Sequence, residues 1–420
     1  MSIREAKGRE IASKCNLTRK GNLYLVPSQS GRGAYTVNPE TGRCTCPDFD
    51  FTRAKCKHIF AVEVVAKRET KTVTETKADG STKTTVTETV KVTRKTYAQD
   101  WPAYNMAQTK EKAIFLYLLH QLCQGAGEPA QMNGRPRLPL EDMLFAMSYK
   151  VYSTVSGRRF ASDLKDAHAK GYLSALPSYN TIFRYFESEM LTDYLLMLIE
   201  ESSLPLQAIE EDFAVDSSGL STGARIKWHD AKWGGMLAEF GAVQQRRDRR
   251  DWVKVHIMCG VKTNVITAVE VTDSNAADTK HFQSLVEATA QNFAMRQVSA
   301  DKAYLSNNNL KVVAENQAMP YIAFKASNTG RGAGNSELFR KMFHYYSYNQ
   351  ERFMRNYHKR SNVETTFQML KAKFGDSLRS KTRRAQINEA LCKVLCHNIC
   401  CLIQSMFELG LKPKFWKVAA

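Results

Sequence analysis

The stretch Tyr357-His-Lys-Arg-Ser-Asn-Val-Glu-Thr-Thr-Phe-Gln-Met-Leu-Lys371 carries two helical patterns side by side. At about 100° per residue, four of its polar or charged residues fall within a stripe roughly 60° wide. These residues are Tyr357, Arg360, Glu364 and Lys371. An apolar stripe with spacing i, i+4, i+7 and i+11 lies beside it. It consists of Val363, Phe367, Leu370 and Phe374, with Gly375 as a helix stop. We therefore expect a helix docked on a core, with one carboxylate at the edge of the contact between flanking cations.

A second interpretation of the same stretch is a capping box. Ser361-x-x-Glu364 fits the start of a surface helix, in which case Tyr357 and Arg360 precede the helix and the charged stripe shrinks. The residues of this stretch alone support both interpretations equally.

The spacing Y-x2-R-x3-E-x6-K resembles the motif around the last acid of the DDE transposases of bacterial insertion sequences. All four motif residues are present, at Tyr357, Arg360, Glu364 and Lys371. This resemblance favours the longer helix. It implies a catalytic domain with a ribonuclease-H-like fold and two further aspartates upstream.

Length and charge are consistent with a multidomain protein that meets a polyanion. A chain of 420 residues with 43% hydrophobic residues supports two or three domains with sizeable cores. Lys and Arg number 60 against 42 Asp and Glu, a net charge of +18 with a pI near 9.4. This excess favours a nucleic-acid partner, the alternative being a generically basic surface.

The chain shows no secretory or membrane pattern. It starts with the polar MSIREAKGRE, so we expect no signal peptide. The most apolar stretch, Ala390–Leu411, is interrupted by residues such as Lys393 and His397 and is expected to be a buried amphipathic helix. Ten cysteines without a secretion signal indicate a reducing compartment, with thiols buried or bound to metal.

Four residues near the N-terminus have the spacing of metal ligands. Cys44-Thr-Cys46 is followed after nine residues by Cys56-Lys-His58. We expect the first two on a hairpin and the second two at a helix start. Three thiolates and one imidazole match a closed tetrahedral zinc site, whose metal would supply much of the folding free energy of a small domain. The C-x-C…C-x-H pattern resembles the SWIM zinc finger over roughly residues 20–66, a family associated with DNA or protein binding.

Residues 67–100 contain a near repeat, Thr72–Lys77 and Thr85–Val90, around Ala78-Asp-Gly-Ser81. Alternation around Asp-Gly is a hairpin signal, although a polar two-stranded ribbon is marginal by itself. We expect either a protruding hairpin or a linker.

Residues 101–205 predict a helical domain, which would bind DNA. The expected helices are 109–123, 139–151, 158–170, 178–188 and 189–202, with Ser178 as an N-cap. The turn 171–177 allows a helix-turn-helix with Asn180, Thr181 and Arg184 facing a groove, but an ordinary helical bundle is slightly favoured. Gly134–Arg137 is either a basic arm or a solvated loop.

From about residue 206 the pattern changes to short apolar strands. The expected strands are 213–215, 252–257, 265–271, 297–300 and 321–324, and the expected helices are 278–292 and 308–316. The order strand, strand, strand, helix, strand, helix, strand, helix is the ribonuclease-H-like order. We therefore expect a mixed α+β and α/β protein. Its ribonuclease-H-like mixed sheet with flanking helices, residues 206–420, follows a zinc finger over 1–66 and the helical domain.

Asp216 and Asp301 each follow one of these short strands. If the two strands are neighbours, their carboxylates project at the same edge, and Glu364 on the docked helix completes the set. Three carboxylates suit two divalent ions roughly 3.5–4 Å apart that act on a phosphodiester. Oxygen ligands favour Mg²⁺, with Mn²⁺ as a substitute. His256 and His281 receive no predicted role.

The resemblance to DDE transposases extends over roughly residues 130–410. By analogy, Asp216, Asp301 and Glu364 would be the catalytic acids, and Tyr357, Arg360 and Lys371 would contact phosphates of the transposon end. The implied partners are two DNA ends, target DNA and a second protomer, in a bacterial cytoplasm at the nucleoid. The zinc finger is a departure, since many relatives lack one.

The segment from Lys325 to Arg384 is strongly basic. It contains fourteen Lys and Arg against four acids, a net +10 out of +18. This excess surrounds the third acid, as a channel that follows phosphates requires. Arg246–Arg250 is a second basic cluster. We expect a transposase that cuts and joins DNA; the alternatives are a non-catalytic DNA-binding regulator and a nuclease without strand transfer.

Overall fold

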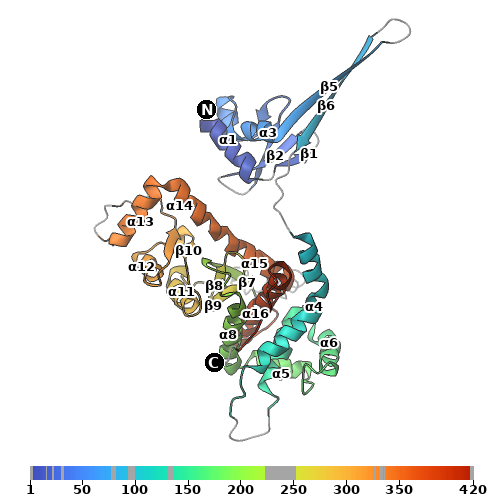
Figure 1. Cartoon of the computed structure of the whole chain (residues 1–420), viewed down its shortest axis with the longest axis vertical. Coiled ribbons are helices and arrows are strands. Elements are labelled where there is room, and N and C mark those ends of the chain that lie inside the picture. Colours follow the sequence, from blue (N-terminus) through green and yellow to red (C-terminus); the bar gives the residue numbers. More distant parts are fainter. Residues whose placement is uncertain are drawn as a thin grey trace, which may run out of the picture. The chain divides into compact units, whose positions relative to one another are not determined.

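The computed structural model describes residues 3–15, 17–20, 23–29, 33–76, 82–92, 100–130, 137–222, 252–325, 328, 330, 334 and 336–416. The basic cluster at 246–250 and most of the arm at 134–137 lie outside these residues. The chain divides into two compact units, Met1–Gln99 and Asp100–Ala420 (Figure 1).

The first unit packs three helices and a small antiparallel sheet around the predicted metal ligands. The sheet has the order β1 (Thr18–Lys20), β2 (Leu23–Pro27), β3 (Ala34–Asn38) and β4 (Arg43–Cys44). The helices are α1 (Ile3–Lys14), α2 (Pro47–Thr52) and α3 (Lys57–Val65). Gly8 lets α1 approach α3, because a Cβ there would lie 2.5 Å from the Cβ of Phe60. The hairpin predicted at Cys44 and the helix start predicted at Cys56 and His58 are confirmed, whereas Cys46 lies beyond the hairpin, at the start of α2.

A long hairpin extends this unit. Strands β5 (Ala66–Thr76) and β6 (Thr82–Val92) pair antiparallel from Ala66↔Val92 to Thr76↔Thr82. The hairpin interpretation of the Thr-rich repeat is therefore confirmed, and the Asp-Gly turn itself lies outside the described residues.

The second unit begins with the five predicted helices. They are α4 (Trp101–Gln124), α5 (Leu140–Ser153), α6 (Gly157–Ala169), α7 (Tyr179–Phe186) and α8 (Met190–Ser203). The start predicted for α4 was wrong. Asp100 caps the helix by accepting a hydrogen bond from the Ala103 N–H at 3.1 Å, and Pro102 occupies the first turn, where a missing N–H costs nothing. The predicted N-cap Ser178 accepts from the Thr181 N–H at 3.2 Å.

A five-stranded mixed sheet forms the centre of the second unit (Figure 1). Its order is β11 (Met319–Ile322), β10 (Gln297–Ala300), β7 (Asp212–Ser221), β8 (Trp252–Gly260) and β9 (Ile266–Asp273). β7, β8 and β9 pair antiparallel, whereas β10 runs parallel to both β7 and β11. A short 3-10 helix, η2 (Asp278–His281), leads into α11 (Phe282–Ala290), and α12 (Asn307–Glu315) lies between β10 and β11. The predicted order of elements is confirmed.

One strand was predicted too short. β7 was expected to end before Asp216, but it continues to Ser221, because β8 supplies antiparallel partners as far as Ser221↔Trp252. The parallel partner β10 ends earlier, opposite Val215. The predicted strand at 321–324 also lies earlier, at Met319–Ile322, where it pairs with β10.

Both faces of the sheet are buried in separate hydrophobic clusters. Along β7, Ala214 enters the cluster shared with α4, α5, α8 and the long C-terminal helix α16 (Arg383–Glu408). Its neighbours Phe213 and Val215 enter the cluster with α11 and α12, as the alternation of a strand requires. The helices of residues 101–205 therefore share a core with the sheet. The division proposed at residue 205 stays a prediction.

The long helix α16 is the central helix of the first of these clusters. It is long and apolar enough to cross a membrane, yet 78% of its apolar window is buried inside the unit. It contacts α4, α5 and α8. The side chain of Asn398 bonds the backbone of Ile266 in β9, at 2.8 Å to its N–H and 2.7 Å to its C=O. The prediction of a buried helix is confirmed.

The motif stretch is helical throughout. α13 (Glu337–Tyr348) and α14 (Gln350–Tyr357) lead through a 3-10 turn, η4 (His358–Arg360), into α15 (Ser361–Phe374). The capping-box interpretation is wrong, because Ser361 has helical backbone angles and its hydroxyl donates to the carbonyl of His358 at 2.9 Å. All four residues of the predicted apolar stripe are buried, and Gly375 ends α15 with φ 81°.

Candidate active site and candidate metal centre

Asp216 and Asp301 occupy equivalent places on two neighbouring parallel strands. The last parallel pair of β7 and β10 is Val215↔Ala300, and each aspartate is the next residue along the chain, Asp216 within β7 and Asp301 just after β10. Asp301 also caps the 3-10 turn η3 (Lys302–Tyr304), accepting from the Lys302 N–H at 2.7 Å. The sheet topology therefore brings the two acids to one edge, as the sequence pattern predicts.

Glu364 joins this edge through Arg360. The Arg360 guanidinium lies 2.7 Å from a carboxylate oxygen of Glu364 and 3.6 Å from one of Asp216. Glu364 is on the first turn of α15, with 57% of its side chain exposed. Tyr357, one turn earlier, places its ring 6.0 Å from the same guanidinium. Thus a cation bridges two of the three acids.

The electrostatics of the cluster act on Asp216. Burial raises the pKa of this carboxyl, and the charges of Asp301 and Glu364 add to the increase. The Ser217 N–H, which donates at 2.8 Å, and the Arg360 guanidinium oppose this increase in pKa.

The carboxylate oxygens of the three acids are hard donors, which fit Mg²⁺ or Mn²⁺. Among the residues described, however, only the cysteine–histidine group near the N-terminus gathers three or more ligand atoms within 4.8 Å.

A surface cavity of about 660 Å³ opens beside these acids. Asp216, Glu364 and Lys371 line it, together with Ser218 on β7. The Lys371 ammonium donates to the Ser218 hydroxyl at 2.5 Å, which ties α15 to β7. Burial lowers the pKa of Lys371, and the charge of Asp376 opposes this. The cavity thus places two carboxylates and one cation around the same space.

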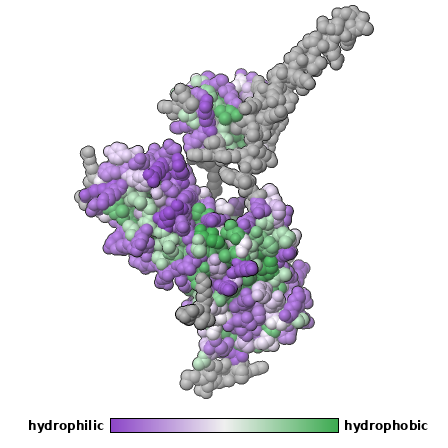
Figure 2. Space-filling view, viewed as in Figure 1, coloured by the Kyte–Doolittle hydropathy of each residue, from purple (hydrophilic) through white to green (hydrophobic). Residues whose placement is uncertain are grey.

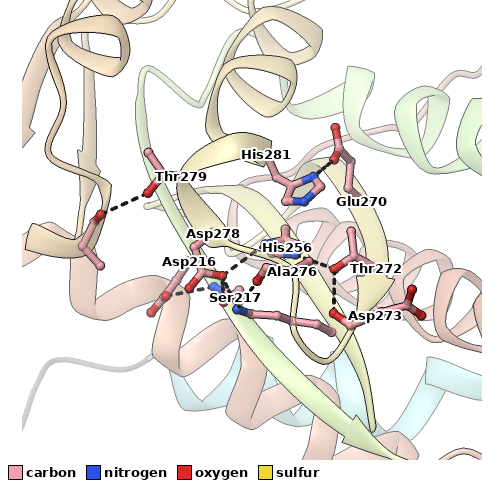
Figure 3. Close-up of polar contacts among 12 residues, drawn as sticks. Asp216, Ser217, His256, Glu270, Thr272, Asp273, Ala276, Asp278, Thr279 and His281 are labelled. Carbon is pink, nitrogen blue, oxygen red and sulfur yellow. Dashed lines mark hydrogen bonds and ion pairs between the residues drawn. The ribbon is translucent and has the colours of Figure 1, made fainter.

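A polar network that the sequence did not reveal lies beside Asp216 (Figure 3). The Ser217 hydroxyl donates to Asp278 at 2.7 Å, and the Lys254 ammonium lies 2.6 Å from the same carboxylate oxygen. His256 places Nδ1 3.4 Å from that oxygen and Nε2 2.8 Å from the Thr272 hydroxyl. Burial lowers the pKa of His256 to about 4, so the ring is neutral at neutral pH.

This network joins the segments that carry both aspartates. Asp278 begins η2, and the next residue, Thr279, donates to the carbonyl of Ala303 in η3 at 3.2 Å (Figure 3). η3 directly follows Asp301. The only sequence signal was the position of Ser217 next to Asp216, and Asp278 was counted there as an ordinary helix start.

The opposite end of β7 is a structural site. Asp212 pairs with Arg296 at 2.6 Å and with Lys359 at 2.8 Å. Lys359, although inside the motif stretch, is therefore directed away from the cavity.

The basic surface of the preceding helices is exposed to solvent. Hydrophilic residues cover α13 and α14 (Figure 2), with Arg340, Arg352 and Arg355 exposed.

The first unit holds the candidate metal centre. Cys44 ends β4, Cys46 caps α2, Cys56 precedes α3 and His58 lies in its first turn. All four are buried, and their ligand atoms lie within 4.8 Å of one another. The His58 Nδ1 lies 3.9 Å from the Cys44 Sγ and 3.8 Å from the Cys56 Sγ. Donors around a tetrahedral zinc ion are about 3.5–3.8 Å apart, so the set fits zinc.

Hydrogen bonds hold the thiols of this centre. The Cys46 N–H donates to the Cys44 Sγ, and the Phe49 N–H to the Cys46 Sγ, each at 3.4 Å. A hydrogen bond from Cys44 lowers the pKa of Cys56 to about 3. The proximity of Cys56 conversely raises the pKa of Cys44. Without a metal, the thiols of this centre share protons through hydrogen bonds. A bound dication would take the place of those protons.

Both centres coincide with known families. Residues 208–399 match the transposase DDE domain, a range that contains Asp216, Asp301 and Glu364. Residues 35–67 match the SWIM zinc finger, a range that contains all four metal ligands. The chain matches no curated protein.

Proposed function

Since the chain carries a transposase DDE domain and a SWIM zinc finger, we propose that it is a DNA transposase. It binds the inverted-repeat ends of its own mobile element and catalyses metal-dependent strand cleavage and strand transfer. The observation that supports this best is the placement of Asp216 and Asp301 directly after the last parallel pair of β7 and β10, with Glu364 linked to Asp216 through Arg360. The mixed sheet with helices on both faces supports a ribonuclease-H-like fold for this domain.

In this proposal, the three acids hold the divalent ions and the motif cations hold DNA. Mg²⁺ or Mn²⁺ ions bound there supply activation of the attacking oxygen and stabilisation of the leaving oxygen. Lys371, on the cavity wall, and Arg360, with its fork of donors, contact the phosphates that flank the cut. Tyr357 holds the plane of the Arg360 guanidinium.

The chemistry proceeds in two displacements at phosphorus. A water oxygen attacks the phosphodiester at the element's end, the bond to the 3′ oxygen breaks, and a 3′ hydroxyl is freed. That hydroxyl then attacks a phosphodiester of the target in line, its oxygen forms the new bond to phosphorus, and the bond to the target's own 3′ oxygen breaks, which leaves a 3′ hydroxyl on the target strand. Proximity within an assembly of two protomers and two ends makes the second step effectively intramolecular.

The Asp278 network has a positioning role in this proposal. Because Asp278 binds Ser217 on β7, and Thr279 binds Ala303 after Asp301, η2 keeps the two acid-bearing segments at a fixed separation. Two ions at a short mutual distance require that the ligand segments do not move independently.

The zinc finger is proposed to hold one zinc ion through Cys44, Cys46, Cys56 and His58 and to bind DNA or a protein partner. The paired strands of its hairpin belong to the same compact unit. We expect the protein to act on DNA in the bacterial cytoplasm.

The test of this function uses the DNA that flanks the reading frame as the source of the ends. The protein is incubated with a duplex carrying one inverted repeat, a supercoiled plasmid and Mg²⁺, and the products are separated on a gel. Joined product is expected. Cut duplex without joining would instead identify a nuclease, and bound but uncut duplex a non-catalytic regulator.

A further inference from the structure

A second and larger cavity, of about 840 Å³, lies on the face of the sheet that packs against α5 and α16. We call it the Lys150 cavity. It is lined by Lys150 on α5, Gly157 at the start of α6, Phe183 on α7, and Arg379 and Lys381 in the segment between α15 and α16. None of the three predicted acids lines it.

The ammonium of Lys150 lacks a partner in the described part of the chain. Its residue is only 8% exposed, and no hydrogen bond or ion pair with another described residue reaches Nζ. Burial lowers the pKa of this group to about 8; the charge of Arg379 lowers it further, and the charge of Glu389 raises it. A largely buried cation without a hydrogen-bonding partner is unfavourable, and an anion in the cavity would supply one.

Lys393, on the same cavity, shows the contrast. It is even less exposed, at 2%, and burial lowers its pKa to about 8 as well. Its ammonium, however, donates to the carbonyls of Gly375 and Ser377, each at 2.8 Å. Lys393 is therefore structural, whereas Lys150 is available to a ligand.

Other groups around Lys150 favour an anion. The N-terminus of the thirteen-residue helix α6 reaches the cavity through Ser156 and Gly157, and its first turn holds no acid. The carboxylate of Glu389 is already satisfied by the N–H groups of Arg379 and Ser380, at 2.8–3.0 Å. Glu187 is the other acid of the lining.

An aromatic face completes the cavity. Phe183 is 46% exposed, and its ring is packed against Gly157, where a Cβ would lie 2.6 Å from the Phe183 Cζ. Any other residue at 157 would therefore displace the ring. A partly exposed aromatic ring next to cations is the combination that binds a base together with its phosphate.

The cavity is connected to the acids along the same elements. β7 carries Asp216 in the first cavity, and Thr222, just after its end, lines the second. Leu378 donates its N–H to the Ser221 carbonyl at 2.7 Å, which joins the following segment to this strand. The six residues of extended chain from Asp216 to Thr222 span about 20 Å. The two cavities are therefore separated by about the length of six stacked nucleotides at 3.4 Å each.

We propose that the Lys150 cavity binds one unstacked nucleotide of the DNA strand that the neighbouring acids cut. Its phosphate lies between Lys150 and the start of α6, and its base lies on Phe183. This assignment rests on the proposed function, since it takes the strand from the adjoining active site.

The position of the nucleotide is tested with 2-aminopurine, whose fluorescence increases when the base unstacks. It is placed singly at successive positions of the inverted-repeat duplex, and fluorescence is measured with the full-length zinc-loaded protein in a buffer without Mg²⁺ or Mn²⁺. An increase is expected at one or two positions, about five to seven nucleotides from the cut. A uniform response, or none in a protein that joins DNA, overturns the proposal.

Variants identify the cavity as the origin of the signal. Phe183→Ala should abolish the fluorescence increase and weaken binding about tenfold or more, the effect of one base–aromatic stack.

Lys150→Met should flatten the salt dependence of binding by about one phosphate contact. Its unfolding temperature should be unchanged or higher, because an unpaired buried cation is removed. Lys393→Met, the control, should unfold at a lower temperature. Wild-type binding and salt dependence in Lys150→Met would overturn the proposal.

Two further comparisons distinguish this proposal from its alternatives. Because the fluorescence assay contains no Mg²⁺ or Mn²⁺, a localised increase in a protein that never joins DNA would keep the cavity and reject the transposase. Free dAMP is titrated with the same protein. Saturation at micromolar concentration, with loss of the DNA signal, would assign the cavity to a free nucleotide and overturn its assignment to the strand.

Discussion

Arg360 and Glu364 form an ion pair of 2.7 Å across one turn of the helical motif stretch. The same guanidinium lies 3.6 Å from Asp216 on the sheet, so the pair is also the bridge between the helix and β7. Two acids held around one cation differ from a surface ion pair, since removing either of them changes the environment of the other.

The acids should be required for cutting and not for holding DNA. Asp216→Asn, Asp301→Asn and Glu364→Gln keep size and much of the hydrogen bonding, but each removes a carboxylate ligand. Nicking should fall by at least about a hundredfold, about 2.7 kcal/mol. A gel-shift assay with EDTA should show binding equal to wild type or slightly tighter.

The matched control is Glu351→Gln on α14. Glu351 forms the same kind of i,i+4 pair, with Arg355 at 3.3 Å, but is far more exposed. It should nick at the wild-type rate. Wild-type nicking by Glu364→Gln would instead remove the third acid from the site.

Asp216 should destabilise the metal-free protein at neutral pH. Its pKa is raised in the folded state, chiefly by burial, so the folded protein favours the protonated form. The ionised carboxylate therefore opposes folding above its ordinary pKa of 3.8, and this cost disappears as pH falls towards that value. With EDTA at pH 7, Asp216→Asn should unfold at a higher temperature than wild type. The difference should shrink near pH 4, and a lower unfolding temperature at pH 7 would contradict the assignment.

Lys371 should contact a phosphate. Lys371→Ala should reduce the slope of log affinity against log salt by about 0.9. Lys373→Ala, two residues along α15, is the control, because its ammonium is paired with Glu111 of α4. The control should keep the slope and lose some stability. Equal slopes in wild type and Lys371→Ala would make its bond to Ser218 a purely structural contact.

Asp278 should position the catalytic acids without binding DNA. Asp278→Ala leaves Lys254 and the Ser217 hydroxyl without their carboxylate, so the cutting rate should fall about tenfold or more while end binding stays unchanged. Asp278→Asn, which still accepts from Ser217, should restore part of the rate. If both variants cut like wild type, the network only stabilises the fold.

Zinc should be necessary for the first unit. Cys56→Ser should lose the metal, as measured by elemental analysis of the purified full-length protein, and residues 1–99 should become sensitive to protease. Cys15→Ser is the control, since this cysteine lies outside the ligand group. An unchanged zinc content in Cys56→Ser would exclude the site.

Much of this site could be predicted because its residues follow strong local patterns. Asp216 and Asp301 each follow a short apolar run in the sequence, and the spacing of Val363, Phe367 and Leu370 fixes which face of α15 is buried. The end of β7 could not be predicted, because β8, which extends it, is fixed by pairing across the chain. Nor could Asp278, whose importance lies in a contact with Ser217 sixty-one residues away.

The role of Lys150 could not be predicted from the sequence either. Nothing in its helical sequence distinguishes it from Lys393, and only the structure gives one of them two carbonyl acceptors and the other none among the described residues. Local pattern predicts which elements form, whereas the state of a buried charge depends on what surrounds it.

The burial of α16 has a consequence for synthesis on the ribosome. This helix leaves the ribosome after every other described helix and strand, yet it supplies the contacts that cover α4, α5, α8 and β9. The first unit has its own core and can fold early, as domains generally do during translation. The second unit cannot close its core until α16 emerges. A nascent or truncated chain without α16 would therefore have an open core behind the sheet, so that the proposed active site would form only after this helix, Arg383–Glu408, has left the ribosome.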